Sequence, residues 1–365
     1  MTTALAAGYR ADLAALRRRR REHEAAADPA SSAAASEVLA LRHREVMLAG
    51  GLPDELIALG TALDRAVARF PAWPDLALLR AGVALALHRP DRAQLALDAV
   101  PRLAEQPAGR VLAADIAQFG GDYAAAREGY ERAGREDPLW GTTARLAALA
   151  VATGRFDEAD DRYAEAEDGI TAKQMRAFAW VRVQRGDLAR SLGDLNRADR
   201  CYADAGRAYP GWWYVTAHRA ASEVSGGRYA DAIDGYRSVL AEVDRPDFRE
   251  ALGTALAAAG HSAEAAQHLT EARQAYLSSV LRGEVHYLHH LAAHYADVVP
   301  DPEAAVGWAE HDVRIRRSGP TLSLLGWCLF LAGRIDESRA AVAEALALGA
   351  GDPRLQARAR SIGAG

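Results

Sequence analysis

The sequence predicts an all-α fold made of repeated helix pairs, on the basis of its composition and one periodicity. Alanine is abundant and β-branched residues are sparse, so helix propensity is high along almost the whole chain. A glycine-led segment recurs with a period of about 34 residues, which indicates stacked repeats. With 365 residues, 50% of them hydrophobic, the chain can bury a sizeable core.

The recurring segment places a small and a large side chain at fixed distances after its glycine. Its copies are "GDYAAAREGY" from Gly121, "GRFDEADDRY" from Gly154, "GDLNRADRCY" from Gly193, "GRYADAIDGY" from Gly227, "GHSAEAAQHL" from Gly260 and "GRIDESRAAV" from Gly333. The small position holds Ala126, Ala159, Ala198, Ala232 and Ala265, and the large position holds Tyr130, Tyr163, Tyr202, Tyr236 and Leu269. Residues four apart share one helical face, so both positions are predicted to pack.

Each residue type in this segment has a physical reason. Glycine can end a helix in the left-handed conformation, and alanine lets the two helices of a hairpin approach closely. An apolar helix is predicted before each segment, as in "TTARLAALAVAT", and Pro138 and Pro210 close units because proline cannot continue a helix. Each unit is therefore predicted to be a helical hairpin.

These features resemble the tetratricopeptide repeat (TPR) family, whose 34-residue unit carries W-x2-L-G-x2-Y, then A-x3-F, then P. The match is clearest in "LGTALAAAGHSAEAAQHL" from Leu252 and in "LGWCLFLAG" from Leu325. It departs at Asp244, which replaces the closing proline, and at Ser338, which replaces the small alanine. The stretch from Ser323 also looks like the C-terminal end of a broad group of bacterial TPR proteins. The resemblance implies a right-handed α-solenoid of stacked helix-turn-helix hairpins, with a concave groove that binds a peptide or a protein surface.

The pattern divides the chain into four stretches. Residues 1–34 are predicted to form an N-terminal helical arm, residues 35–106 degenerate TPR-like repeats, residues 107–350 about seven repeats, and residues 351–365 a C-terminal cap or tail. Five arginines, Arg17 to Arg21, point all round the predicted helix and favour a solvated arm, with a phosphate-binding tail as the alternative. The small polar residues that follow suggest a loose connection.

Projecting each first helix inward predicts the side chains that line the groove. They mix aromatic anchors with isolated charges, as interaction surfaces do. The predicted set is Asp115, Gln118, Trp180, Asp187, Arg190, Tyr214, Glu250, Thr254, His286, His289, Trp327 and Phe330. Any one of them could instead be an ordinary exposed or inter-repeat side chain. The aromatic cluster Tyr209 to Tyr214 is expected to pack between hairpins, with an aromatic ligand platform as the alternative.

Four of the eleven histidines lie within nine residues, in "VHYLHHLAAHYAD" from Val285 to Asp297. The repeat frame predicts this stretch as the first helix of the penultimate hairpin, packed by Leu291, Ala292 and Tyr295, with His286 and His289 facing the groove. The alternative is a metal site formed by His286, His290 and His294, because histidines one helical turn apart can share a metal ion.

Composition and motifs argue against several function classes. The net charge of -5 and the pI near 6.1 supply no general basic field, so no nucleic-acid partner is expected. There is no apolar run of about 18 residues and no secretion-type N-terminus, so a cytoplasmic protein without a membrane partner is expected. Cys201 and Cys328 are expected to be packed thiols. No G-x-S-x-G, H-E-x-x-H or phosphate-loop motif occurs, so neither catalysis nor a cofactor is expected.

The leading functional hypothesis is a non-catalytic scaffold that binds a protein or peptide in the concave groove. The alternative is a metal-binding or accessory subunit of a bacterial biosynthetic enzyme, which would use the His286–His294 cluster. A third possibility is an oligomerisation module, which would make the protein a homo-oligomer. The alanine-, arginine- and glycine-rich composition fits a GC-rich bacterial genome.

Overall fold

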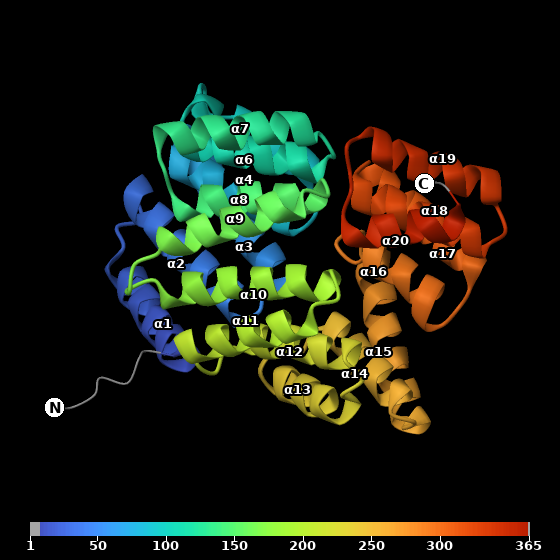
Figure 1. The fold of residues 1–365 in the computed structure, drawn as a ribbon. Helices are drawn as coiled ribbons and strands as arrows, with labels where there is room; N and C mark the ends of the chain where they lie inside the picture. The colour runs from blue at the N-terminus through green and yellow to red at the C-terminus, as the bar shows by residue number, and fades with distance from the viewer. Residues whose placement is uncertain (1–7, 364–365) are drawn as a thin grey trace.

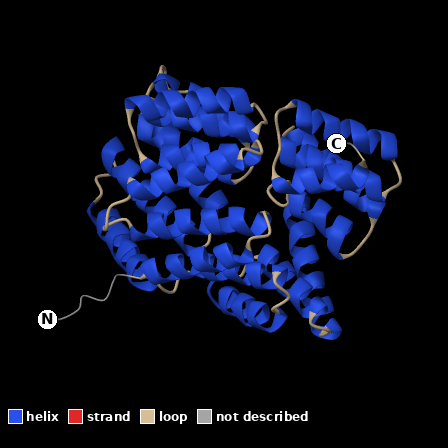
Figure 2. Cartoon of the chain, viewed as in Figure 1, coloured by secondary structure: helices blue, strands red, loops and turns tan. Residues whose placement is uncertain are grey.

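The computed structural model describes residues 8–363, and helices account for most of this range (Figures 1 and 2). The described residues contain 20 α-helices, one short 3-10 helix, one π-helical turn and no strand. The α-helices are α1 (Tyr9–Ala26), α2 (Ser32–Ala49), α3 (Pro53–Arg69), α4 (Pro74–Ala86), α5 (Pro90–Asp98), α6 (Pro107–Phe119), α7 (Tyr123–Glu136), α8 (Trp140–Ala152), α9 (Phe156–Asp168), α10 (Met175–Ser191), α11 (Leu195–Ala208), α12 (Trp213–Ser225), α13 (Tyr229–Glu242), α14 (Pro246–Ala258), α15 (Ser262–Leu281), α16 (Leu288–Ala293), α17 (Pro302–Ile315), α18 (Gly319–Leu331), α19 (Ile335–Ala347) and α20 (Pro353–Ile362). The 3-10 helix η1 spans Leu103–Glu105, and the π-helical turn η2 spans His294–Val298.

From α4 onward, successive helices pair as hairpins that stack on one another. The pairs are α4/α5, α6/α7, α8/α9, α10/α11, α12/α13, α14/α15, α16/α17 and α18/α19, and α20 packs on the last pair. The alanines of the small position are buried, and so are the four tyrosines of the large position. The predicted all-α solenoid of TPR-like hairpins is confirmed.

The glycines that begin the recurring segment have the predicted backbone conformation. Gly121, Gly154, Gly193, Gly227, Gly260 and Gly333 all have φ between 73° and 88°. Side chains other than glycine adopt this left-handed region at a cost, so glycine is the favoured residue there. The departure at Ser338 is accommodated because its hydroxyl donates a hydrogen bond of 2.7 Å to the Gly326 carbonyl inside the hairpin.

The N-terminal helices pack against hairpins that lie far away in the sequence. Tyr9 and Leu13 of α1 are buried in the same apolar cluster as Tyr209 and Trp213. The Tyr9 amide donates to the Pro210 carbonyl (3.1 Å), and the Trp213 indole N–H donates to the Leu48 carbonyl at the end of α2 (3.0 Å). Helices α1 and α2 are therefore an integral part of the packed structure, and the connection between them is limited to residues 27–31.

The C-terminal hairpins return to the first half of the chain, as the orange and red helices beside α6–α9 show in Figure 1. The Gly319 amide donates to the Tyr123 hydroxyl (3.1 Å), and the Gly351 amide donates to the Ala152 carbonyl (2.9 Å). The solenoid is closed on itself at this junction.

The histidine-rich stretch is the first helix of the penultimate hairpin, with Leu291 and Ala292 buried as predicted, but the helix is shorter than the stretch itself. Helix α16 begins only at Leu288, and the π-helical turn η2 replaces its last turn. The start is displaced because Tyr287 packs on Tyr276 of α15, with ring centroids 5.1 Å apart, while still in the turn. Pro300 and Pro302 end the helix, since proline supplies no N–H for a continuing helix.

Candidate functional site

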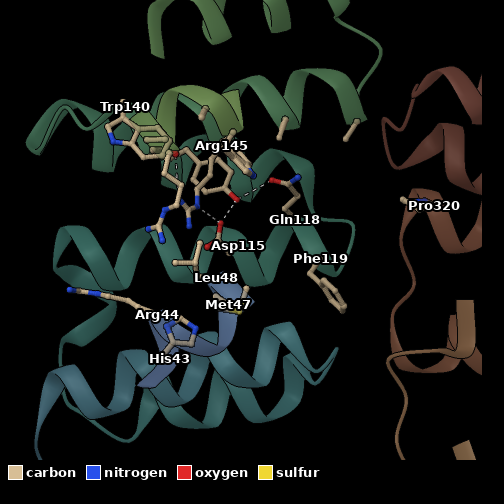
Figure 3. Close-up of a pocket in the computed structure, with 18 of the residues that line it drawn as sticks. His43, Arg44, Met47, Leu48, Asp115, Gln118, Phe119, Trp140, Arg145 and Pro320 are labelled. Atoms are coloured by element: carbon tan, nitrogen blue, oxygen red, sulfur yellow. Dashed lines mark hydrogen bonds and ion pairs between the residues drawn. The ribbon is translucent and has the colours of Figure 1, made fainter. Parts of the chain in front are cut away.

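A cavity of about 880 Å³ lies against the first helices of three successive hairpins. Helices α6, α8 and α10 form one wall, while α2 and residues 316–320 bound the other sides (Figure 3). We call it the inner cavity. Its lining residues are His43, Arg44, Met47, Leu48, Asp115, Gln118, Phe119, Tyr123, Tyr130, Trp140, Gly141, Ala144, Arg145, Ala148, Ala152, Arg176, Ala177, Trp180, Trp212, Arg316, Ser318 and Pro320.

The Asp115 carboxylate is the centre of a hydrogen-bond network in the polar part of the cavity wall. The Tyr130 hydroxyl donates to Asp115 at 2.7 Å and also lies 3.0 Å from the Gln118 amide oxygen, and Arg145 Nε donates to Asp115 at 2.8 Å (Figure 3). Burial and then the Asp115 charge raise the pKa of Tyr130, so its hydroxyl stays protonated and donates. Asp115 is thus neutralised by partners from its own hairpin and the next one.

Aromatic side chains from separate hairpins form the apolar part of the wall. The rings of Trp140 and Trp180 are tilted with centroids 6.3 Å apart, and Trp212 lies against Tyr214 at 4.9 Å. Such surfaces offer large contact area with few rotatable bonds. The cavity can therefore bury an apolar or aromatic group of a ligand.

Basic side chains reach the cavity from three parts of the chain. Arg316 donates to Asp312 at 3.1 Å, and its guanidinium lies 5.0 Å from the centre of the Phe119 ring. Arg44 of α2 and Arg176 of α10 are exposed, and within residues 8–363 neither has a carboxylate at ion-pair distance. Burial and then the neighbouring Arg44 lower the pKa of His43, so His43 adds no charge at neutral pH.

Of the predicted groove residues, the structure brings Asp115, Gln118 and Trp180 together at the inner cavity. Asp187 of α10 repeats the role of Asp115 two hairpins further on. It accepts from the Tyr202 hydroxyl (2.8 Å), pairs with His218 (2.7 Å) and lies 3.4 Å from Arg190.

The remaining predicted groove residues lie outside the lining of the inner cavity. The Tyr214 hydroxyl accepts from Gln184 (2.9 Å), and the Thr254 hydroxyl donates to the Glu250 carbonyl in its own helix (2.9 Å). Trp327 stacks on Phe330 and donates to Asp297 (2.8 Å). His286 is 7% exposed and contacts Ser279 at 3.2 Å, while His289 contacts Asp312 at 3.2 Å. Each of these side chains therefore has a hydrogen-bonding or stacking partner within the chain.

The three histidines of the metal alternative do not converge on one point. His286 contacts Ser279, His290 stacks on Tyr276, and the Nδ1 atom of the fully buried His294 lies 2.9 Å from Glu250. Across the part of the chain that the structure describes, no group of three or more histidine, cysteine, aspartate or glutamate side chains is arranged to hold a metal ion. The metal alternative finds no support here.

Several cavity residues are absent from the groove set predicted by the sequence. Trp140 and Arg145 lie on the first helix α8, so the same inward projection could have found them. Arg44 and Met47 belong to α2, and Arg316 to a connection near the C-terminus, so no periodicity in the sequence signals their presence. Both cysteines are buried free thiols, as expected.

Comparisons with known proteins identify the fold. No family model matches the chain, and no curated protein does. Among solved structures, a chain of the APC/C hetero-tetramer Cut9-Hcn1 matches with a TM-score of 0.52 and 11% identity, over 95% of this chain and 59% of that chain. A monomeric mutant of IFIT1 with Gppp-AAAA matches with a TM-score of 0.52 and 15% identity, over 86% of this chain and 71% of the other.

The fold is a TPR-like α-solenoid. This chain spans only 59% of the length of the first of these two matches, and identities this low show the fold alone. None of the helices among residues 8–363 combines the length and the apolar character needed to cross a lipid bilayer.

Proposed function

We propose that this protein is a non-catalytic scaffold that binds a peptide segment of a partner protein in the inner cavity. One observation carries the proposal: first helices of three successive hairpins present Trp140, Trp180 and their neighbours to a space of about 880 Å³. Buried aromatic anchors in such a space supply most of the affinity in typical interfaces. The similarity to a chain of the Cut9-Hcn1 hetero-tetramer agrees with a role in assemblies.

A bacterial and cytoplasmic setting is part of the proposal. Its support is the alanine-, arginine- and glycine-rich composition together with two cysteines that remain free thiols, as in reducing compartments.

The test fills the cavity and compares the result with a matched change outside it. Ala148 lines the cavity on α8, so Ala148→Phe places a ring where the ligand would lie. Ala124 is exposed on α7 and is absent from the cavity lining, so Ala124→Phe is the control. Phage-displayed random dodecapeptides are selected on the full chain, and affinities of the selected peptides are measured by fluorescence anisotropy.

We expect the selected peptides to bind Ala124→Phe like the unmodified protein and Ala148→Phe at least about tenfold more weakly, because each lost apolar contact group is worth on the order of 1 kcal/mol. Thermal unfolding curves of both variants are measured as a control that they are folded. Equal binding to the two variants would place the binding surface elsewhere and contradict the proposal.

A further inference from the structure

Two arginines of the inner cavity lack the partners that the other cavity arginines have. Arg145 is held by Asp115 and Arg316 by Asp312. Arg44 and Arg176 are exposed and line the cavity, yet among the described residues no aspartate or glutamate comes within 4.0 Å of either guanidinium. A cation without a carboxylate next to an apolar surface is available to a ligand.

The cavity also has a charge opposite to that of the whole chain. Its lining contains four arginines, of which Arg145 and Arg316 are paired with Asp115 and Asp312. Among residues 8–363 this leaves the positive charges of Arg44 and Arg176 uncompensated, whereas the chain has a net charge of -5. Because α2 and α10 are far apart in sequence, this local excess of positive charge exists only in the folded chain. A negatively charged ligand is attracted to the cavity even though the protein as a whole repels it.

We propose that the segment bound in the inner cavity is acidic: aspartate or glutamate carboxylates pair with Arg44 and Arg176, and an apolar or aromatic side chain between them packs on Trp140 and Trp180. This inference rests on the proposed peptide-binding function. Guanidinium groups match carboxylates with two parallel hydrogen bonds, and the tryptophan surface suits an uncharged side chain. The acidic residues set the specificity, and the aromatic contact supplies buried area.

The alternative of a nucleic-acid strand is disfavoured by charge. A strand carries one phosphate at every nucleotide, and binding strength depends on how many phosphates are neutralised. Within the described range, the cavity offers the two guanidiniums of Arg44 and Arg176 without a carboxylate partner, and the chain as a whole is net acidic. A short acidic peptide needs no more cations than these two.

The experiment examines the composition of the selected peptides and removes the two charges. The double variant Arg44→Gln/Arg176→Gln keeps the length and polarity of both side chains. The control Arg18→Gln/Arg65→Gln removes the same charge from two exposed helical positions that are absent from the cavity lining. Dodecapeptides selected on the full chain are sequenced, and the affinity of the best one is measured by anisotropy at low and at physiological salt.

We expect the selected peptides to be enriched in aspartate or glutamate together with an aromatic residue. Their affinity should fall at least about tenfold in Arg44→Gln/Arg176→Gln and stay unchanged in the control, because charge-assisted hydrogen bonds contribute more than neutral ones. Added salt should weaken binding to the unmodified protein more than binding to the double variant.

Other outcomes separate this inference from the function on which it rests. Neutral or basic peptides that bind in the cavity, or an acidic peptide that binds the double variant equally well, overturn the inference and leave peptide binding in place. A poly(A) oligonucleotide that displaces the selected peptide and binds more tightly also overturns it. Peptides that bind Ala148→Phe and the unmodified protein alike contradict the proposed function itself.

Discussion

Asp115 and Asp187 are carboxylates on first helices that are held by hydrogen bonds within the fold. Each accepts a hydrogen bond from the tyrosine fifteen residues later, at 2.7 Å and 2.8 Å, and each also contacts a basic side chain of the next hairpin. The tyrosine of the large position therefore satisfies the carboxylate that faces inward from the preceding first helix. These carboxylates therefore have partners in the absence of any ligand. Arg44 and Arg176, which have no carboxylate partner among residues 8–363, are the charged groups of the cavity that are free to bind a ligand.

His88, at the end of α4, is a residue whose protonation is expected to weaken the fold. Burial, and then the charge of Arg316, lower its pKa to about 3; Asp312 opposes this shift, while His286 and His290 add to it. A lowered folded-state pKa means that the folded protein favours the neutral ring. Its contribution to stability is therefore complete above the ordinary pKa of about 6.5 and is lost as the pH falls towards about 3.

The variant His88→Asn tests this expectation. His88 has φ of 59°, and asparagine tolerates that conformation without titrating. Between pH 6 and pH 4 the free energy of unfolding, measured with urea, should fall less steeply in the variant, by up to about 1.4 kcal/mol per pH unit. The remaining slope in the variant would come from other histidines with a lowered pKa, such as the partly buried His43. Identical slopes in the two proteins would mean that His88 is charged in the folded state.

At the scale of elements, helices α1 and α2 decide the shape of the binding surface. In α1, Tyr9 and Leu13 are buried against the α11–α12 junction, and the Tyr209 hydroxyl donates to Asp12 at 2.9 Å. Helix α2 then supplies Arg44, Met47 and Leu48 to the inner cavity. An open solenoid would offer a long groove, whereas these two helices reduce it to a bounded cavity.

The docking of α1 can be tested by proteolysis. Leu13→Asp places a carboxylate in a buried apolar site, which is costly and should release the helix. Trypsin should then cleave at Arg17 to Arg21 several-fold faster than in the unmodified protein, because a released helix frays and exposes its backbone. Ala14→Asp makes the same charge change on the exposed side of α1 and should leave the cleavage rate unchanged. Equal rates in both variants would indicate that α1 is not held by its apolar contacts.

At the scale of the whole molecule, contacts between the C-terminal hairpins and α7–α8 close the solenoid. The chain approaches itself so closely at this junction that a Cβ atom at Gly351 would lie 3.1 Å from the Thr153 backbone. The Tyr123 hydroxyl accepts from the Gly319 amide across a separation of 196 residues. The segment 316–320 lines the inner cavity because this closure holds it there.

A larger side chain at this junction should open the molecule. Gly351→Leu is expected to break the hydrogen bond to Ala152 and to lower the free energy of unfolding by about 1–3 kcal/mol, as overpacking usually does. Small-angle X-ray scattering should show a larger radius of gyration. Gly307→Leu, at an exposed helical glycine with nothing within 4 Å of its added Cβ, is the control and should leave the radius unchanged. An unchanged radius of gyration in Gly351→Leu would mean that the junction accommodates the leucine side chain without opening.

The sequence predicted the parts of the fold that depend on local interactions. Gly121 and its counterparts have the predicted left-handed backbone, and Ala126 and Tyr130 are buried as the repeat pattern requires. It placed the histidine stretch correctly in the penultimate hairpin, with Leu291 and Ala292 buried, but it missed the boundaries of the helix. Helix α16 begins only at Leu288, after Tyr287 has packed on Tyr276. The role of the predicted groove residues in binding a partner, and the division of the chain at residues 34, 106 and 350, stay predictions.

By itself, the sequence determined that this protein is a stack of helical hairpins, because helix propensity, glycine caps and the alanine–tyrosine spacing all act within one repeat. Only the tertiary structure decided what the concave side offers to a ligand. The contacts that bring Leu48 to Trp213 and Gly319 to Tyr123 span 165 and 196 residues, and they depend on the curvature summed over many repeats. The cavity comes from that curvature, and so does the position of Arg44 and Arg176, which have no carboxylate partner among residues 8–363; no single repeat specifies it.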